Sequence, residues 1–355
     1  MKRRDFLHVT VAAAGAASLP CAAAHGDDDI RASKLPRWRG FNLLEKFIAE
    51  AKQPFVERDF AWIRDWGFDF VRLPLDYRCW SRQDDWSKLD DAELKQIDDA
   101  VALGEKYGVH VNIAFHRAPG YCVNKNPPEL VSLWDNDAAQ AAFANHWRAF
   151  AKRYAGIPNA RVSFNLVNEP DIIAEDKYVR VALRAIEAIR EEDSKRLIIS
   201  DGRQWARVPV PSLATHGIAQ STRGYDPMRI SHHKAGWVQG ADKWETPTWP
   251  LPSESGDWNK DRLRKVYIDP WKAIEAKGVG VHVGEWGAFN QTPHDVTLAW
   301  MRDFLALWKE ADWGWAMWNL RGSMGIVDSQ RADMQYEEFE GHKLDRAMLD
   351  LMRAN

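Results

Sequence analysis

Two segments of this 355-residue chain set the expectations for its fold: VSFNLVNEP at residues 162–170 and VHVGEWG at residues 281–287. Each is a run of apolar, strand-forming residues that ends in a glutamate and is then stopped by a proline or a glycine. A continuous apolar run is typical of a parallel strand that is buried on both faces. Such a strand would deliver Glu169 or Glu285 at its C-terminal end, which in a barrel of parallel strands is the open mouth.

The same kind of strand recurs from Trp38 onward, in alternation with helical patterns. We predict strands at residues 39–43, 68–73, 109–115, 162–167, 197–200, 228–231, 279–283 and 313–318, and helices at residues 54–66, 89–107, 136–154, 177–190, 261–277, 296–308 and 344–352. Eight such units in succession predict an α/β fold, a single-domain (β/α)8 TIM barrel over residues 38–355. The connection over residues 234–257, rich in Trp, Pro and Gly, is expected to form a wall of the cleft.

The first 24 residues have the features of an export signal. Arg3 and Arg4 precede Phe-Leu, an Ala-rich apolar run covers residues 9–19, and small residues at 22–24 offer a cleavage site. This order predicts a Tat-type signal peptide over residues 1–24, followed by a flexible segment over residues 25–37. We therefore expect an exported protein, periplasmic or extracellular. A lipoprotein signal that uses Cys21 is the alternative.

The composition narrows the classes of partner. The formal net charge is -3 and no basic stripe occurs, which argues against binding of nucleic acid. After removal of the signal, no stretch is expected to cross a membrane. We expect a monomer. The 19 tryptophans either pack in the core or form platforms for sugar rings. Cys79 and Cys122 follow neighbouring predicted strands and could pair or stay free, and they lack the spacing of a metal site.

Glu169 and Glu285 carry the chemistry that the sequence predicts. In a barrel of eight strands, the ends of the fourth and seventh strands can face each other across the mouth. Two carboxylates about 5–5.5 Å apart can cut a glycosidic bond with retention, one as nucleophile and the other as proton donor. The donor must stay protonated near neutral pH, which requires a raised pKa. Taken singly, either glutamate could also be a solvated loop residue.

With these residues in view, the chain resembles glycoside hydrolase family 5 of the clan A barrels, from about Trp38 to the C-terminus. The most specific match is LVNEP at residues 166–170. The resemblance implies that Glu169 is the acid/base, that Asn168 bonds the 2-hydroxyl of the substrate, and that Glu285 is the nucleophile. The two-carboxylate mechanism requires no cofactor and no metal.

Three further residues match positions of the family pattern. The resemblance implies that Arg72 in VRLP, which Pro74 would place at a strand end, keeps the nucleophile ionised. It also implies that His116 in IAFH contacts the sugar bound just before the cut, and that Trp318 in WAMWN floors the same subsite. The alternatives are a salt bridge at the barrel rim for Arg72, a hydrogen-bonded core histidine for His116, and packing for Trp318, with Trp315 as its rival.

The predicted sixth strand departs from the family pattern, which usually shows His-x-Tyr with the tyrosine bonded to the nucleophile. The sequence reads ISHHK at residues 230–234. We take His232 as the family histidine and as a substrate-binding residue, with His233 as the alternative. Lys234 or Ala235 then stands where the tyrosine should, so the nucleophile is expected to lack this partner or to receive one from elsewhere.

Other residues are weaker candidates. Asn42 and Glu45 follow the first strand, where the family often binds distal sugars, although Glu45 could simply start a helix. Asp328, in the loop after the eighth strand, is expected to cap local backbone. Tryptophans in predicted mouth loops could stack on further sugar rings; these are Trp80, Trp134, Trp237, Trp244, Trp249 and Trp286.

The sequence thus predicts an exported retaining glycoside hydrolase, cellulase-like, that cleaves β-1,4-linked polysaccharide by double displacement. A β-mannanase or an exo-acting β-glucosidase of the same clan is the alternative, so glucan or mannan, and endo or exo action, stay open. A non-catalytic carbohydrate-binding barrel is disfavoured because both glutamates occur with Arg72. A metal-dependent barrel hydrolase is disfavoured because no metal-binding histidine motif occurs.

Overall fold

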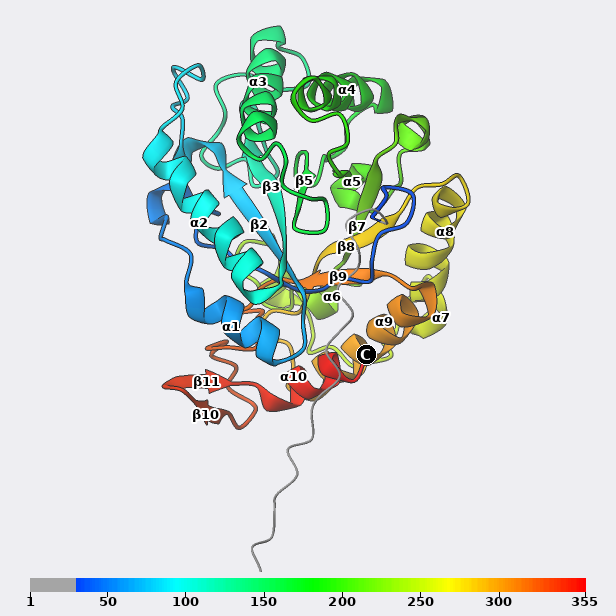
Figure 1. Cartoon of the computed structure of the whole chain (residues 1–355). Helices are drawn as coiled ribbons and strands as arrows, with labels where there is room; N and C mark the ends of the chain where they lie inside the picture. The colour runs from blue at the N-terminus through cyan, green and yellow to red at the C-terminus, as the bar shows by residue number, and fades with distance from the viewer. Residues whose placement is uncertain (1–29) are drawn as a thin grey trace, which may run out of the picture.

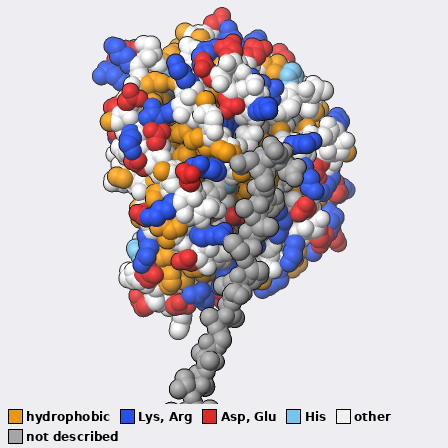
Figure 2. Space-filling model, in the orientation of Figure 1, with side chains coloured by type: hydrophobic (Ala, Val, Ile, Leu, Met, Phe, Trp, Pro, Cys, Tyr) orange, Lys and Arg blue, Asp and Glu red, His pale blue; other side chains and the backbone are white. Residues whose placement is uncertain are grey.

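The computed structural model describes residues 30–355, which form a ring of strands surrounded by helices (Figure 1). The predicted signal peptide at residues 1–24 lies outside the described residues, as do residues 25–29 of the segment predicted to follow it. On the face shown in Figure 2, acidic and basic side chains are interspersed, in line with the small net charge. No helix within the described residues is long and apolar enough to span a bilayer.

Eight parallel strands close into a barrel, which confirms the predicted (β/α)8 fold. The strands are β1 (Arg39–Asn42), β2 (Phe70–Asp76), β3 (His110–Ala118), β5 (Val162–Asn165), β6 (Ile198–Asp201), β7 (Ala219–Gly224), β8 (Val281–Trp286) and β9 (Gly314–Met317). They lie in the order β2-β1-β9-β8-β7-β6-β5-β3, and β2 pairs with β3 to complete the ring. The short β4 (Tyr121–Cys122) pairs antiparallel with β3, and β10 (Glu337–Phe339) pairs with β11 (His342–Leu344) in a separate ribbon.

Helices connect the strands and cover the outside of the ring. The α-helices are α1 (Glu57–Asp65), α2 (Asp91–Tyr107), α3 (Asp137–Arg153), α4 (Glu175–Glu192), α5 (Arg203–Ala206), α6 (Met228–Ser231), α7 (Lys260–Leu263), α8 (Asp269–Glu275), α9 (His294–Ala311) and α10 (Arg346–Arg353). A π-helical segment, η5 (Arg264–Ile268), joins α7 to α8, and short 3-10 turns are η1 (Ala49–Ala51), η2 (Tyr77–Cys79), η3 (Pro211–His216) and η4 (Ala241–Lys243). Local sequence fixes several helix ends: the side chain of Asn136 accepts from the backbone N–H of Ala139, and α2 ends at Gly108 with a φ of 64°.

Aromatic side chains fill the space between the strands and the helices. Phe115 of β3 stacks on Trp147 of α3 with ring centroids 4.0 Å apart. Elsewhere in the barrel, Trp286 of β8 makes edge contacts with Trp308 of α9 and Trp315 of β9. Each such fully buried side chain stabilises the fold by about 1.5–3 kcal/mol. Most of the tryptophans serve this packing role.

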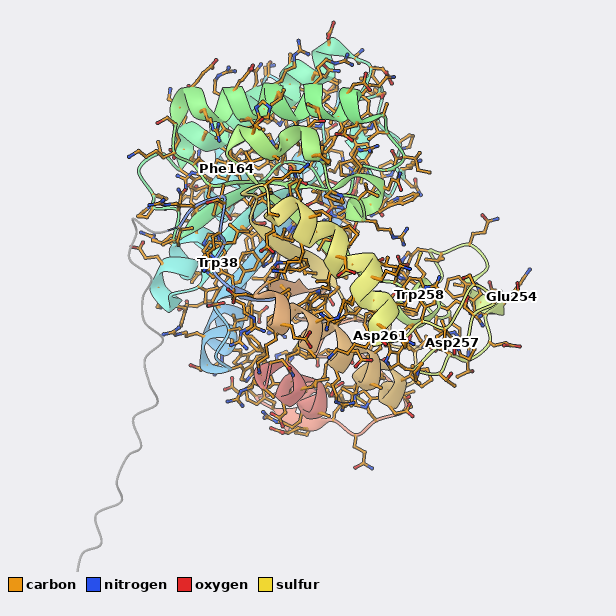
Figure 3. The ribbon with its side chains drawn as sticks, turned by 90° about the vertical axis from the view of Figure 1, so that its right-hand side faces the viewer. Trp38, Phe164, Glu254, Asp257, Trp258 and Asp261 are labelled. Carbon is orange, nitrogen blue, oxygen red and sulfur yellow. The ribbon has the colours of Figure 1, made fainter. Side chains whose placement is uncertain are left out.

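A second apolar cluster closes the N-terminal end of the barrel. The ring of Trp38 stacks on that of His110 with centroids 3.7 Å apart, and Phe70 stacks on His110 at 5.4 Å. In Figure 3, Trp38 lies toward one end of the molecule, and the loop that carries Glu254 and Asp257 projects at the opposite end. Side chains thus fill the barrel at the Trp38 end, and the candidate site lies at the other end.

The predicted sixth strand at residues 228–231 is wrong, because these residues form the short helix α6. The sixth strand of the barrel is β7, whose sequence AQSTRG is polar and does not look like a buried strand. Its polar groups are satisfied by tertiary neighbours. The side-chain amide of Gln220 donates to and accepts from the backbone of Val210 at 2.9 Å, and Thr222 donates to the carbonyl of Ala206.

Two smaller expectations concern β2 and the cysteines. β2 does not end at Pro74 but continues to Asp76, so Arg72 lies within the strand and not at its end. The proline therefore does not explain why the side chain of Arg72 reaches Glu285. Of the two options left open for Cys79 and Cys122, the structure has both as free, buried thiols.

Candidate active site

Glu169 and Glu285 lie together at the mouth of the barrel, where both line one cavity. Glu285 belongs to β8, and Glu169 follows β5 after a short extended segment. The φ of Glu169 is 47°, in the left-handed region that a non-glycine residue rarely adopts. Two hydrogen bonds hold it there: its backbone N–H donates to Asp201 at 2.9 Å, and Tyr121 donates to its carbonyl at 2.6 Å. The backbone around Glu169 is thus held by its surroundings.

Both carboxylate oxygens of Glu285 have partners. Arg72 Nη1 donates to Oε1 at 2.7 Å, and the hydroxyl of Tyr225 donates to Oε2 at 3.2 Å. Arg72 itself is 1% exposed and is fixed by three asparagine side-chain oxygens, those of Asn42, Asn165 and Asn168, at 2.8–3.1 Å. A guanidinium tied in this way presents one N–H to Glu285 with little freedom to turn away.

The guanidinium of Arg223 joins the two glutamates. Its Nε donates to Glu169 Oε1 at 2.9 Å, and its Nη2 lies 3.4 Å from Glu285 Oε1. The same Nη2 donates to Asn168 Oδ1 at 2.9 Å and forms a short ion pair with Asp201. Since one guanidinium contacts both carboxylates, the two glutamates are close neighbours that face the same side of the barrel.

The surroundings of Glu169 favour its protonated form. Burial is the largest cause and the negative charge of Glu285 the second, and together they raise the pKa of Glu169 to about 8, against the opposing effect of Arg223. At neutral pH Glu169 therefore carries a proton and can act as a general acid. Its neighbour Glu285 is paired with Arg72, a cation, in an ion pair of 2.7 Å.

His116 and Trp318 line the cavity beside the glutamates. Phe47 contacts both rings edge-on, with centroids 4.4 Å from His116 and 5.1 Å from Trp318. Neither ring nitrogen of His116 has a hydrogen-bond partner among the described residues, and burial keeps its pKa well below the usual value, so the imidazole is neutral. The side-chain N–H2 group of Asn168 likewise has no partner there. Both groups therefore keep hydrogen-bonding capacity that a bound ligand or water could use.

The cavity has a volume of about 910 Å³ and is open to solvent. Its wall includes apolar and aromatic side chains, among them Leu44, Ile48, Trp205, Met228, Trp237 and Met324. His232 also lines it, although not from the strand that the sequence suggested; its Nδ1 lies 2.7 Å from Ser231 Oγ, and burial lowers its pKa to about 4. The predicted wall over residues 234–257 contributes Trp237, Val238 and Gln239.

Sequence reasoning missed three residues of the site: Asp201, Arg223 and Tyr225. Of the two options left open for the nucleophile, a missing partner or one supplied from elsewhere, the structure has the second, because Tyr225 follows β7 and donates to Glu285. The signal was present as Arg-Gly-Tyr at residues 223–225, but it follows a polar segment that was not recognised as a strand. Lys234, the residue placed there by the sequence reading, lies beyond α6.

Some of the weaker candidates contribute to the site and others do not. Asn42 supports Arg72, whereas Glu45 is not among the cavity-lining residues and burial raises its pKa to about 7. Asp328 accepts from a backbone N–H, but it is that of Lys343, 15 residues further along the chain, so the cap is not local. Of the six tryptophans considered for mouth loops, Trp237 lines the cavity; the others, which are buried or half-buried, are Trp80, Trp134, Trp244, Trp249 and Trp286. Within residues 30–355, no group of three or more His, Cys, Asp or Glu side chains could hold a metal ion.

Comparisons with known proteins identify the relatives of this chain. The family model described as cellulase, glycosyl hydrolase family 5, matches residues 32–323. Among curated proteins, the chain is similar to Endoglucanase C of Acetivibrio thermocellus, with 26% identity over 313 residues that cover 79% of this chain and 90% of the relative. It is also similar to Cellodextrinase A of Ruminococcus flavefaciens, with 26% identity over 255 residues that cover 69% and 72%, respectively.

Solved structures show the same architecture. A crystal structure of a glycoside hydrolase has a TM-score of 0.86 and 38% identity, over 90% of this chain and 99% of that chain. The endoglucanase Cel5A of Thermotoga maritima has a TM-score of 0.73 and 19% identity, over 89% and 96%. The second likeness concerns the fold alone.

Proposed function

The chain belongs to glycosyl hydrolase family 5, and on this basis we propose that it is an exported, retaining enzyme that cleaves β-1,4-linked polysaccharide, with glucan as the substrate. Membership makes it a hydrolase of O-glycosyl bonds that acts on polysaccharide. The proposal adds the linkage, the stereochemical course and the export. The observation that carries it is the pair Glu169 and Glu285, held side by side by Arg223 in different surroundings at an open cavity.

The proposed reaction has two steps. In the first, Glu285 attacks the anomeric carbon while Glu169 gives its proton to the leaving oxygen, which forms a glycosyl-enzyme and releases the shortened chain. In the second, the anionic Glu169 takes a proton from water, and the water oxygen attacks the anomeric carbon and breaks the ester to Glu285. The hydrogen bonds from Arg72 and Tyr225 support the role of Glu285, because they orient both its oxygens. The raised pKa of Glu169 supports its role as donor.

Unpartnered groups around the pair support binding of one sugar unit at this point. The side-chain N–H2 group of Asn168 would donate to the 2-hydroxyl, His116 would bond another hydroxyl, and the indole of Trp318 would form the floor. Trp205 and Trp237, which are 37% and 60% exposed, stand further out on the cavity wall and could stack on neighbouring units. An open cavity with several aromatic platforms suits a polymer.

The test is a panel of soluble β-1,4-glucan, β-mannan, β-xylan and short cellodextrins, with product sizes resolved over time. We expect fastest cleavage of β-1,4-glucan, and products of mixed length if the action is internal. The anomeric form of the first product, followed by proton NMR, should be β, which reports retention. Faster cleavage of mannan would show that mannan, and not glucan, is the substrate. Release of single terminal units would show that the enzyme is exo-acting. An α product would exclude the retaining mechanism.

Export is proposed from the paired arginines at positions 3 and 4 and the apolar run that follows them. In a bacterial host with a functional Tat system, the full chain should appear outside the cytoplasm with residues 1–24 removed. The variant in which Arg3 and Arg4 are both replaced by lysine should stay in the cytoplasm at full length. Equal export of both forms would contradict a Tat signal.

A further inference from the structure

The residue at position 223 differs from the histidine of the family pattern in His-x-Tyr. β7 ends in Arg223-Gly224, and Tyr225 follows, so an arginine stands where the pattern has a histidine that can be neutral. Arg223 is 2% exposed, and its side chain points into the site rather than to solvent. A fixed positive charge between two catalytic carboxylates changes the electrostatics of the site, because guanidinium groups stay protonated.

Three carboxylates meet this one guanidinium. Arg223 donates to Glu169 and to Asp201, and lies 3.4 Å from Glu285. Asp201 is completely buried and also accepts from the backbone N–H of Glu169 at 2.9 Å and from the amide of Asn165 at 3.0 Å. Asp201 therefore holds both the backbone of Glu169 and the arginine that contacts its side chain.

The charges of this group balance when one proton is present. Glu169, Asp201 and Glu285 bring three negative charges if all are ionised, whereas Arg72 and Arg223 bring two positive charges. A buried site with an uncompensated charge is costly, so one proton is favoured in the free enzyme. Of the three carboxylates, Glu169 has the fewest partners for its side chain, a single bond from Arg223.

We propose that Arg223, held by Asp201, is a positioning residue that limits how tightly Glu169 holds its proton and thereby sets the alkaline limit of activity. The inference rests on the proposed function. When Glu285 becomes an ester, one negative charge is lost, and the two arginines and Asp201 then favour an anionic Glu169. The proton that Glu169 gave to the leaving oxygen is replaced by one from water when the ester is hydrolysed. Arg223 and Asp201 thus act on Glu169 in both steps of the reaction.

The charged and titratable groups that face Arg223 and Glu169 come from several elements. They are Arg72 of β2, His116 of β3, Tyr121 of β4, Tyr178 of α4, Asp201 of β6, Tyr225 after β7, and His282 and Glu285 of β8. Burial lowers the pKa values of the two histidines and raises those of the three tyrosines. These five groups are therefore neutral between about pH 7 and 9 and do not compete with Glu169 for the proton in this window.

The test compares the pH profile of kcat/KM for the wild type with three variants: Arg223→Gln, Asp201→Asn and the double variant. Loss of Arg223 removes a positive charge from Glu169, so the alkaline limb should move up by roughly one unit or more. Loss of the negative charge of Asp201 should move the limb down. The double variant should lie between the two, near the wild type. Limbs that stay in place, or that move in the same direction in both single variants, overturn the proposal.

A matched control uses a second ion pair before β6, formed by the buried Arg196 and the half-buried Asp193, neither of which lines the cavity. Arg196→Gln removes a buried guanidinium and should lower thermal stability without moving the alkaline limb. If Arg223→Gln does not fold, Asp201→Asn remains decisive, because asparagine has the same shape and its oxygen can still accept from Glu169 N–H.

A second readout separates this inference from the proposed function. The carboxyl carbon of Glu169 can be titrated by carbon NMR in protein labelled at glutamate, with its signal identified by its loss in Glu169→Gln. If no glycan in the panel is cleaved, the proposed function fails, but this titration should still move up in Arg223→Gln and down in Asp201→Asn. A titration that does not respond to either variant overturns the role of Arg223 even in an active enzyme.

Discussion

Glu169 and Glu285 are chemically identical side chains that differ only in their neighbours. Glu285 has hydrogen-bond donors on both oxygens, from Arg72 and Tyr225. Glu169 has a single side-chain donor, Arg223, and burial followed by the charge of Glu285 raises its pKa to about 8. Environments that differ in this way support the roles proposed above, with Glu169 as the acid and Glu285 as the nucleophile.

Replacing either glutamate with glutamine should abolish most of the activity. Glu169→Gln removes the proposed proton donor and Glu285→Gln removes the proposed nucleophile. We therefore expect kcat to fall by at least ~10³ in each variant, since each loses a whole catalytic function. Hydrolysis of a soluble β-1,4-glucan measures the effect. Glu275→Gln, which removes a carboxylate from α8 on the outside of the barrel, should behave like the wild type. Near-normal activity in either site variant would rule out the assignment.

The hydroxyl of Tyr225 offers a finer test of the role of Glu285. Tyr225→Phe removes one hydrogen bond to Glu285 but leaves Arg72 in place, so kcat should drop by roughly tenfold, the effect of a bond worth about 1.4 kcal/mol. KM should change little, because the bond is to the enzyme's own carboxylate. Tyr107→Phe, on the surface of α2, is the matched control. An unchanged kcat would mean that Arg72 alone orients Glu285.

At the scale of elements, the single turn α5 (Arg203–Ala206), which follows β6, does not have regular helical dihedral angles. Gln204, Trp205 and Ala206 have φ values of 52°, 60° and 58°, all in the left-handed region. The backbone N–H groups of Gln204 and Trp205 donate to the carbonyls of Asp171 and Pro170. The segment just after Glu169 therefore fixes this turn. The turn then places Trp205 on the wall of the cavity. Strained backbone of this kind often occurs at binding sites.

Trp205→Ala should reduce cleavage of polymer more than cleavage of a short chromogenic glycoside. If the indole stacks on a sugar unit, its loss costs roughly 0.5–1.5 kcal/mol, which corresponds to about a twofold to thirteenfold drop in kcat/KM on polymer. Trp258→Ala provides a control, because Trp258 belongs to the projecting loop and stacks on Arg262 outside the cavity (Figure 3). Equal losses on long and short substrates would show that the turn, rather than the ring, matters.

At the scale of the molecule, the site works against the stability of the fold. The barrel gains stability from buried aromatic packing, yet it also encloses an acid whose ionised form is poorly solvated. The folded state binds the proton of Glu169 more tightly than the unfolded chain, in which the pKa is near 4.5. Stability should therefore fall as pH rises through the window from about 4.5 to about 8, since ionisation then favours the unfolded chain.

Glu169→Gln should remove this penalty, because glutamine cannot ionise. We expect its Tm to exceed that of the wild type by a few degrees at pH 9, roughly the change that 1–2 kcal/mol produces in a domain of this size, and by less at pH 5. Differential scanning calorimetry at both values makes the comparison. A Tm difference that is the same at pH 5 and pH 9 would show that ionisation of Glu169 does not strain the fold.

The sequence by itself determined the barrel and the two glutamates. Strand-forming apolar runs that end in Glu169 and Glu285 are local signals, and their alternation with helical patterns predicts the (β/α)8 order without any contact being known. Arg72 and Asn168 could be named through the family resemblance, because they stand in such runs.

Only the tertiary structure decided which segment is the sixth strand, and with it the roles open to Arg223 and Tyr225. β7 is polar along its length, so no periodicity marks it as buried. Its side chains can be buried because Val210, Ala206 and Asp201, from other parts of the chain, supply their hydrogen-bond partners. Such satisfaction of polar groups exists only once the barrel has closed, which is why a reading along the chain passed over this strand in favour of residues 228–231.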